Sequence, residues 1–467
     1  MQDSIFPLVH HAANFDDRDL PEPVFELTRD LFLDTIGCVL SGGDAKGIAP
    51  LRKIMDFWGG RSQATVLGHN EKTNAPQAAF LNAVMGHAND YDDTHDGALN
   101  HGCVTLVPAL LATCEALASV EGPADPILHR TISGRTFISA LAVGLDVSNR
   151  LGMAFIPYLH VGWLPTTLWG PFACAAACGR LLGLDAEKMQ NAFGLAYSQI
   201  HANRQGLVDG VLSKRIQPAF SAAAGIQAAC FAAAGITGAR NIVDGAFGIR
   251  ALYTHGQIDA GYLSDRVGTF FETLNVSIKP YPCCRCSHPV IDAALSLQKE
   301  HGFGWKDVQS GDIFLPPQSM GQIGNPFAIR NNPTVDAQFS AQYTAALAMI
   351  GGRPRLKDFT VENVRSRGDV AALASKFTVS EFEKDQSGLV PVEMEIRLAD
   401  GRIFRTRIAH PKGSRKNPLS RDELLFKFND CLDNAVRTYT IEDRDRIVQA
   451  ADRIQGLEDM RDFIALL

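Results

Sequence analysis

The chain has 467 residues, of which 46% are hydrophobic and 20% are charged. That balance is typical of a well-packed globular protein and excludes an intrinsically disordered chain. Lysine and arginine number 44 against 51 aspartate and glutamate residues, so the formal net charge is −7. We therefore expect no broad basic surface for nucleic acid or anionic lipid.

Cysteine usage and the first residues bear on the compartment. The ten cysteines are scattered, apart from Cys283, Cys284 and Cys286. The chain starts Met-Gln-Asp-Ser-Ile-Phe, which has neither a basic region nor the apolar core of a signal peptide. These features predict a cytoplasmic protein whose cysteines are reduced core residues.

Helical patterns dominate the first half of the chain, where apolar residues recur at three- and four-residue spacing. The first long one begins at Pro21 and ends at the Ser41-Gly42-Gly43 run. Others follow at residues 78–88, 107–118, 136–151, 167–182 and 186–200. Helices joined by short links with Gly or Pro predict an all-helical body.

Two uncharged stretches, between Arg150 and Arg180 and between Arg215 and Arg240, raise the question of a membrane span. Three prolines interrupt the first. The second is built largely on alanine, and small residues let helices approach closely. We interpret it as a helix surrounded by other helices, and we expect no membrane association.

The pattern changes after about residue 270. Residues 312–315 are typical of a short strand, and residues 392–398 alternate apolar and charged side chains. Asp400 and Gly401 then separate that run from a second alternating run at 403–408, which predicts a hairpin.

The predicted fold is therefore mainly α. A large all-helical domain would comprise residues 1–270 and 411–467, because helical periodicity returns near the C-terminus. A smaller inserted α+β domain would comprise residues 271–410.

The densest polar cluster runs from His87 to His101 and holds three histidines and four aspartates. Such a loop supplies general acid/base groups and potential metal ligands. A solvated helix end with capping aspartates is the structural alternative. Because the spacings match no established ligand pattern, no metal is expected.

Two further clusters precede helices. Residues 279–289 combine Lys279, Arg285 and His288 with three cysteines, a favourable place for a carboxylate or phosphate. Paired Cys-x-x-Cys spacing is missing there, so zinc or iron–sulfur binding is not expected, and a proline-stiffened junction is the alternative. Lys214 and Arg215 introduce the uncharged helix, which by itself is more typical of an ordinary helix start.

Together these segments resemble the MmgE/PrpD family, which includes 2-methylcitrate dehydratase, cis-aconitate decarboxylase and iminodisuccinate epimerase. The resemblance covers about residues 20–410. It is carried, in order, by His87-Ala-Asn-Asp-Tyr-Asp-Asp-Thr-His, Ser213-Lys-Arg, Lys279-Pro-Tyr-Pro-Cys-Cys-Arg-Cys-Ser-His-Pro and Asp336-Ala-Gln-Phe-Ser-Ala-Gln-Tyr343. It implies the same two-domain fold, a homodimer, no metal or other cofactor, and a site between the domains.

The resemblance also implies site residues by position. The catalytic set would be Asp90, Thr94, His101, Lys214, Lys279 and Tyr343, and the substrate-binding set would be His95, Arg285 and His288. Dehydration, decarboxylation and epimerisation next to a carboxylate all need a base, an acid and fixed positive charge. We expect His101 to be the leading acid/base and Asp90 its orienting carboxylate. The two lysines would hold carboxylates, with Arg285 as a further candidate, and Tyr343 would donate a proton or a hydrogen bond.

Two positions depart from the family pattern, because Leu164 and Gln217 stand where many members have histidines. The loss of two groups disfavours a tricarboxylate and favours a less charged acid. The sequence thus predicts a cofactor-independent lyase on a small polycarboxylate, with dehydration ranked before epimerisation and decarboxylation. A metal enzyme using His87, His95, His101 and the cysteines, and a silent binding protein, are the alternatives.

Overall fold

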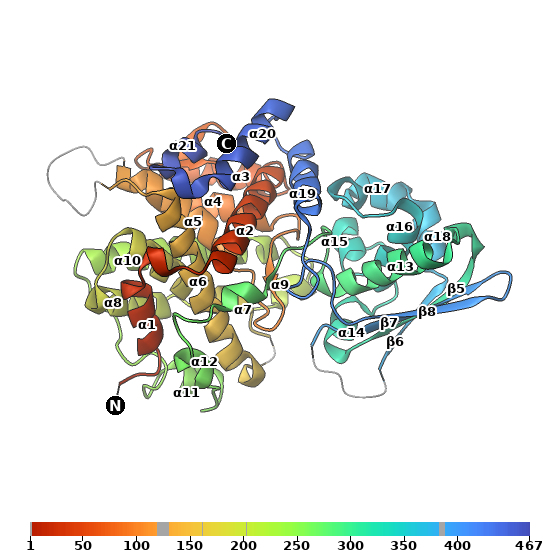
Figure 1. Cartoon of the computed structure of the whole chain (residues 1–467), viewed down its shortest axis with the longest axis horizontal. Coiled ribbons are helices and arrows are strands. Elements are labelled where there is room, and N and C mark those ends of the chain that lie inside the picture. Colours follow the sequence, from red (N-terminus) through yellow and green to blue (C-terminus); the bar gives the residue numbers. More distant parts are fainter. Residues whose placement is uncertain (1, 119–129, 161, 202, 383–387) are drawn as a thin grey trace. The chain divides into compact units, whose positions relative to one another are not determined.

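The computed structural model describes residues 2–118, 130–160, 162–201, 203–382 and 388–467. Over these residues the protein is mainly helical, which confirms the predicted class (Figure 1). Contacts divide the chain into two units. Unit 1 comprises Met1–Ala88, Asp92–Val276 and Cys431–Leu467, and unit 2 comprises Asn89–Tyr91 and Ser277–Asp430. The domain limits at 271 and 410 stay a prediction.

Several helices of unit 1 begin at a side-chain cap. Asn74, Ser133 and Asp185 each accept a hydrogen bond from a backbone N–H in the first turn that follows. The helices are α1 (Phe6–Asn14), α2 (Glu22–Ser41), α3 (Ile48–Trp58), α4 (Ala75–His87), α5 (Cys103–Ala118), α6 (Gly134–Phe155), α7 (Pro165–Leu181), α8 (Ala186–Tyr197), α9 (Gln205–Val208), α10 (Ser213–Ala233), α11 (Ile249–Tyr253), α12 (Gly261–Ser264), α20 (Ile441–Asp452) and α21 (Met460–Ile464).

The alanine-rich helix α10 packs against α4, α5, α7 and α8 of unit 1. Glycine makes this close packing possible, since a Cβ at Gly225 would lie 2.1 Å from the Cβ of Cys174 on α7. Among the described residues, α10 has the length and composition of a membrane span, yet 56% of its apolar window is buried. Its packing is that of a core helix.

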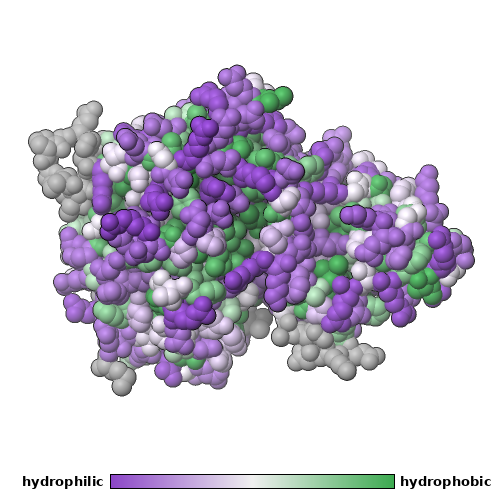
Figure 2. All heavy atoms as spheres, viewed as in Figure 1, coloured by the Kyte–Doolittle hydropathy of each residue, from purple (hydrophilic) through white to green (hydrophobic). Residues whose placement is uncertain are grey.

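Hydrophilic side chains prevail on the face of the molecule drawn in Figure 2.

The sequence predicts an all-helical domain, but unit 1 also contains short strands. Strands β1 (Ala64–Val66) and β2 (Glu71–Thr73) form an antiparallel pair. The short strand β3 (Thr94–His95) also belongs to unit 1, whereas β4 (Val276–Ser277) stands at the boundary, with Val276 in unit 1 and Ser277 in unit 2. Runs of two or three residues are too short to show the alternation by which strands are predicted.

A buried ion pair ties α6 to a later loop of unit 1. Arg150 donates to the Asp146 carboxylate at 2.8 Å, and the backbone N–H of Glu272 donates to the other oxygen of that carboxylate at 2.6 Å. The same guanidinium also donates to four backbone carbonyls, those of Tyr262, Asp265, Arg266 and Phe270. Burial nevertheless raises the pKa of Asp146 to about 6.

Unit 2 contains a four-stranded sheet in the order β6-β5-β7-β8. Its strands are β5 (Val308–Leu315), β6 (Phe377–Glu381), β7 (Val392–Leu398) and β8 (Ile403–Ile408). Strands β7 and β8 pair as the antiparallel hairpin that Asp400 and Gly401 predict. Strand β5 pairs antiparallel with β7 and parallel with β6.

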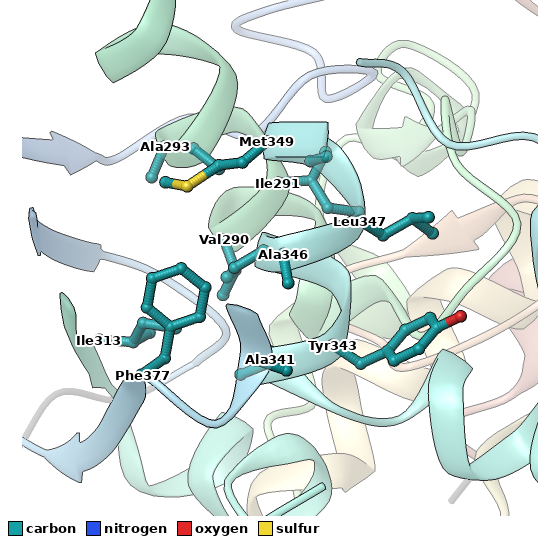
Figure 3. Close-up of a cluster of buried hydrophobic side chains, with 14 of the residues drawn as sticks. Val290, Ile291, Ala293, Ile313, Ala341, Tyr343, Ala346, Leu347, Met349 and Phe377 are labelled. Atoms are coloured by element: carbon teal, nitrogen blue, oxygen red, sulfur yellow. The ribbon is translucent and has the colours of Figure 1, made fainter. Parts of the chain in front are cut away.

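Unit 2 also contains helices, some of which pack against this sheet. They are α13 (His288–His301), α14 (Pro317–Ile323), α15 (Pro333–Gln338), α16 (Ala341–Gly351), α17 (Val361–Ser366), α18 (Gly368–Ala374) and α19 (Arg421–Asp433), the last of which ends beyond the unit. Every second residue of β7 is buried, from Val392 to Leu398. Figure 3 shows side chains of α13, α16, β5 and β6 meeting in this core.

Candidate active site

The loop after α4 returns on itself and brings two residues of the polar cluster together. Asp90 has a φ of 54°, a left-handed conformation that aspartate tolerates better than most residues. After this turn Asp92 accepts a hydrogen bond from Nδ1 of His87, with 2.8 Å between the nitrogen and Oδ2. Both side chains belong to unit 1 and are buried.

Asp92 is shared between two histidines. Its Oδ2 lies 3.2 Å from Nδ1 of His101, and the rings of His87 and His101 meet edge to face with centroids 5.2 Å apart. The second oxygen of Asp92, Oδ1, is buried without a hydrogen-bond partner among the described residues. The side chain of His101 is 22% exposed, so this ring alone of the three groups reaches solvent.

Contacts of His101 assign its tautomer. Nδ1 lies 2.7 Å from the backbone carbonyl oxygen of Asp93, and a carbonyl can only accept a hydrogen bond. The proton of the neutral ring therefore sits on Nδ1, which leaves a lone pair on Nε2. The backbone N–H of His101 donates to Oγ1 of Thr166 at 3.0 Å. This is the arrangement that a general base requires.

The two neighbouring aspartates have opposite protonation tendencies. Burial would raise the pKa of Asp92, but the charges and hydrogen bonds of His87 and His101 bring it well below its usual value. Burial, together with the negative charge of Asp92, raises the pKa of Asp93 to about 7. Neighbouring carboxyl groups with diverging pKa values are typical of acid/base sites.

One further charge acts on this cluster within unit 1. Burial lowers the pKa of His87 to about 4, and the nearby positive charge of Lys214 contributes to that lowering. Lys214, the second residue of α10, is therefore within electrostatic reach of the ring. Thr94, another predicted catalytic residue of unit 1, is buried at the start of β3.

Replacing Asp93 by asparagine should increase stability in a pH-dependent way. The folded pKa is raised, so the native state binds more protons than the unfolded chain between about pH 4 and pH 7, and wild-type stability falls as pH rises through that window. The amide can still accept from the Cys103 N–H. We expect the advantage of D93N to grow by about 2 kcal/mol from about pH 5.5 to pH 8.

Urea unfolding of both proteins at several pH values checks this expectation. Asp422→Asn, which removes an acidic group from the start of α19, is the control for the loss of a carboxylate. An advantage of D93N that stays constant with pH would contradict the assignment.

His95 closes the loop that presents His101. Its Nδ1 accepts from the backbone N–H of Ala98 at 2.9 Å, and its Nε2 lies 3.3 Å from the Glu272 carboxylate. The backbones of His95 and Asn100 pair in a short bridge. Since both ring nitrogens are engaged, this arrangement leaves none for the substrate that His95 was predicted to bind.

The predicted cations of unit 2 have partners inside that unit. Lys279 is buried, and its Nζ lies 3.0 Å from the carbonyl oxygen and 3.4 Å from the carboxylate of Asp90. Arg285 donates to Nδ1 of His288 at 3.2 Å, and Nε2 of that ring faces the Cys283 carbonyl. Burial lowers the pKa of His288, so the ring is neutral.

Tyr343 lies in the apolar core of unit 2, against the ring of Phe327. Its hydroxyl points away from the labelled aliphatic side chains in Figure 3, and it has no hydrogen-bond partner among the described residues. Burial raises the pKa of Tyr343 to about 12, so the hydroxyl keeps its proton. A buried donor without a partner is unusual and is consistent with a role as proton donor.

One predicted pairing is corrected by this geometry. The carboxylate beside His101 is that of Asp92, whereas Asp90 pairs with Lys279. The sequence contained His87 and Asp92 in its densest cluster, but nothing in their spacing indicates that one carboxylate bridges two rings. Two positions were predicted to depart from the pattern of the resembling family. Of these, Gln217 donates to the Asn203 carbonyl at 3.0 Å, and Leu164 immediately precedes α7.

The same cluster bears on metal binding. Over the described residues, His87, Asp92 and His101 form the one group of three ligand atoms within 4.8 Å of one another. The Nδ1 atoms of both rings face oxygen acceptors, so a cation would have to displace their protons. His95 and the cysteines are outside this group, and burial raises the pKa of the Cys283 thiol far above the range in which a thiolate ligand forms readily.

Comparisons with known proteins cover nearly the whole chain. The model of the MmgE/PrpD N-terminal domain matches residues 7–260, and that of the MmgE/PrpD C-terminal domain matches residues 281–453. A cis-aconitate decarboxylase of Aspergillus terreus is 26% identical over 477 residues, covering 98% of this chain and 94% of the relative. A cis-aconitate decarboxylase of Homo sapiens is 26% identical over 465 residues, covering 96% and 91%.

Proposed function

The chain belongs to the MmgE/PrpD family, and on that premise we propose that it is a lyase that acts on a small polycarboxylate. Relatives named as cis-aconitate decarboxylases support this class. One observation carries the proposal: Nδ1 of His101 faces both the Asp92 carboxylate and the Asp93 carbonyl, which leaves the lone pair of Nε2 as a base. The homodimer and the cytoplasmic location stay predictions.

The same nitrogen serves both reactions of this class. In dehydration, Nε2 of His101 removes a proton next to a carboxylate, and the enolate electrons then form a C=C bond as hydroxide leaves and is protonated to water. In decarboxylation, the ring starts as the imidazolium: CO₂ leaves, the electrons of the broken C–C bond stay on carbon, and Nε2–H of His101 donates its proton to that carbon. The Asp92 carboxylate stabilises the imidazolium in each case, because its Oδ2 lies 3.2 Å from Nδ1.

We propose that the substrate has fewer carboxylates than a tricarboxylate such as aconitate. Leu164 and Gln217 replace groups that carry protons or bind anions in many members of the family. Gln217 offers a neutral amide, which also donates to the Asn203 carbonyl. With fewer cationic partners, each additional buried carboxylate costs more.

Incubation in D₂O with a panel of di- and tricarboxylic acids, followed by NMR, tests the proposal. We expect alkene signals without carbon loss for dehydration, or CO₂ release with deuterium at the former carboxylate position for decarboxylation. Deuterium exchange with inversion would instead indicate an epimerase. No turnover and no exchange on any acid would contradict the whole class, and ligand binding without turnover would indicate a silent binding protein.

A further inference from the structure

Three consecutive residues of the loop after α4 are held by unit 2. Asn89–Tyr91 belongs to that unit, although Ala88 and Asp92 on either side belong to unit 1. Each carbonyl of the tripeptide accepts a hydrogen bond from a different side chain. Gln338 Nε2 donates to Asn89 at 3.0 Å, Lys279 Nζ to Asp90 at 3.0 Å and Lys427 Nζ to Tyr91 at 2.7 Å.

The three donors are buried. Gln338, Lys279 and Lys427 are 4%, 1% and 0% exposed. Removing two ammonium groups from water is costly unless good partners replace the lost hydration. Packing alone does not account for this desolvation cost, because a leucine or methionine would fill the same space without burying a charge. Each donor binds a backbone carbonyl of the tripeptide, which an apolar side chain cannot do.

Further contacts fix the tripeptide from its other sides. The Lys427 ammonium lies 4.3 Å from the centre of the Tyr91 ring, a cation–π contact. The Tyr91 hydroxyl donates to the Pro280 carbonyl at 3.2 Å, and Gln338 Nε2 also donates to the Pro282 carbonyl at 2.9 Å. Backbone and side chain of Tyr91 are thus both held within unit 2.

The position of the tripeptide determines where the next residue starts. Tyr91 is joined to Asp92 by one planar peptide group, so the Lys427 contact with the Tyr91 carbonyl orients the plane from which Asp92 departs. Asp92 is the acceptor shared by His87 and His101. The next residue is Asp93, whose carbonyl accepts from Nδ1 of His101 at 2.7 Å. A displacement of this segment would therefore move both acceptors that face the His101 Nδ1 proton.

We propose that Gln338, Lys279 and Lys427 form a carbonyl clamp on Asn89–Tyr91, which positions Asp92 and thereby holds His101 as a base with its proton on Nδ1. The catalytic part of this inference rests on the proposed function. Lys427 and Gln338 act as positioning residues through Asp92. Lys427 lies in the part of the chain beyond residue 410, outside every motif that carries the family resemblance.

Replacing Lys427 by methionine tests the clamp, because methionine keeps most of the volume and loses the donor. Lys376→Met is the matched control, since Lys376 also donates to a backbone carbonyl of unit 2, that of Val308 at 2.6 Å. Hydrogen–deuterium exchange should speed up in residues 89–93 of K427M and stay unchanged in K376M. Nitrogen-15 NMR of the imidazoles should show His101 losing its single Nδ1-protonated form in K427M only.

For the acid that the wild type turns over, K427M should lower kcat by about 100-fold with little change in KM, because the base is misplaced and the substrate contacts remain. If K427M does not fold, Gln338→Met gives the same readouts through the Asn89 carbonyl. Unchanged exchange and an unchanged tautomer in a folded variant would overturn the clamp. If the wild type turns over no acid, the proposed function fails, and the two NMR and exchange readouts still decide on the clamp.

Discussion

Replacing His101 by glutamine should lower kcat for the substrate by about 1,000-fold, the contribution of a positioned general base. The amide of glutamine can still donate to the Asp93 carbonyl, so the local hydrogen bond survives while the lone pair of Nε2 is lost. Steady-state turnover measures the effect, and NMR in D₂O should show that proton exchange at the substrate carbon falls in parallel. Substrate binding should change far less than kcat, because the cationic partners remain.

His201→Gln is the matched control for this variant. The Nδ1 of His201 also faces a backbone carbonyl in unit 1, that of Gln199 at 2.6 Å, yet the ring has no carboxylate partner among the described residues. H201Q should keep wild-type turnover. Full activity in a correctly folded H101Q would remove His101 from the mechanism and leave the family membership intact.

Much of the fold could be predicted because its signals are local. The β7–β8 hairpin follows from two alternating runs on either side of Asp400 and Gly401, and a turn of that kind determines the pairing. Helices follow from their apolar spacing, although this spacing places the start of one of them at residue 78, whereas the Asn74 cap starts α4 at Ala75. The β1–β2 pair could not be predicted, because its three-residue strands depend on neighbours rather than on their own pattern.

The candidate site shows where such prediction ends. Residue types in the His87–His101 cluster indicate acid/base chemistry, but the partner of each group depends on the backbone. A left-handed Asp90 turns the chain, so Asp92 meets His87 and His101, and Asp90 itself meets Lys279. The pairing of Asp90 with His101 was predicted from position in a motif, which carries no information about φ. Lys427 gives no signal at all, because its partner is a carbonyl 336 residues away.

Arg150→Met should be the most destabilising of the substitutions considered, at about 4 kcal/mol near pH 8. It leaves the Asp146 carboxylate buried without its cation and four carbonyls without their shared donor. The pKa of Asp146, about 6 in the native state, lies above its unfolded value, so this group binds a proton on folding as pH falls. Loss of Arg150 strengthens that tendency.

The deficit of R150M should therefore shrink as pH falls from about 8 toward about 6, because Asp146 in the variant, with its higher pKa, takes up a proton that removes the unpaired charge. Below about pH 6 the deficit should level off, since Asp146 of the wild type is then protonated as well. Urea unfolding at several pH values measures it. The double variant D146N/R150M is the control: it has no buried carboxylate to leave unpaired and should be more stable than R150M at about pH 8, with a flatter pH dependence. A deficit that is independent of pH, or a double variant less stable than R150M, would mean that the lost carbonyl contacts rather than the buried charge govern the stability of this part of unit 1.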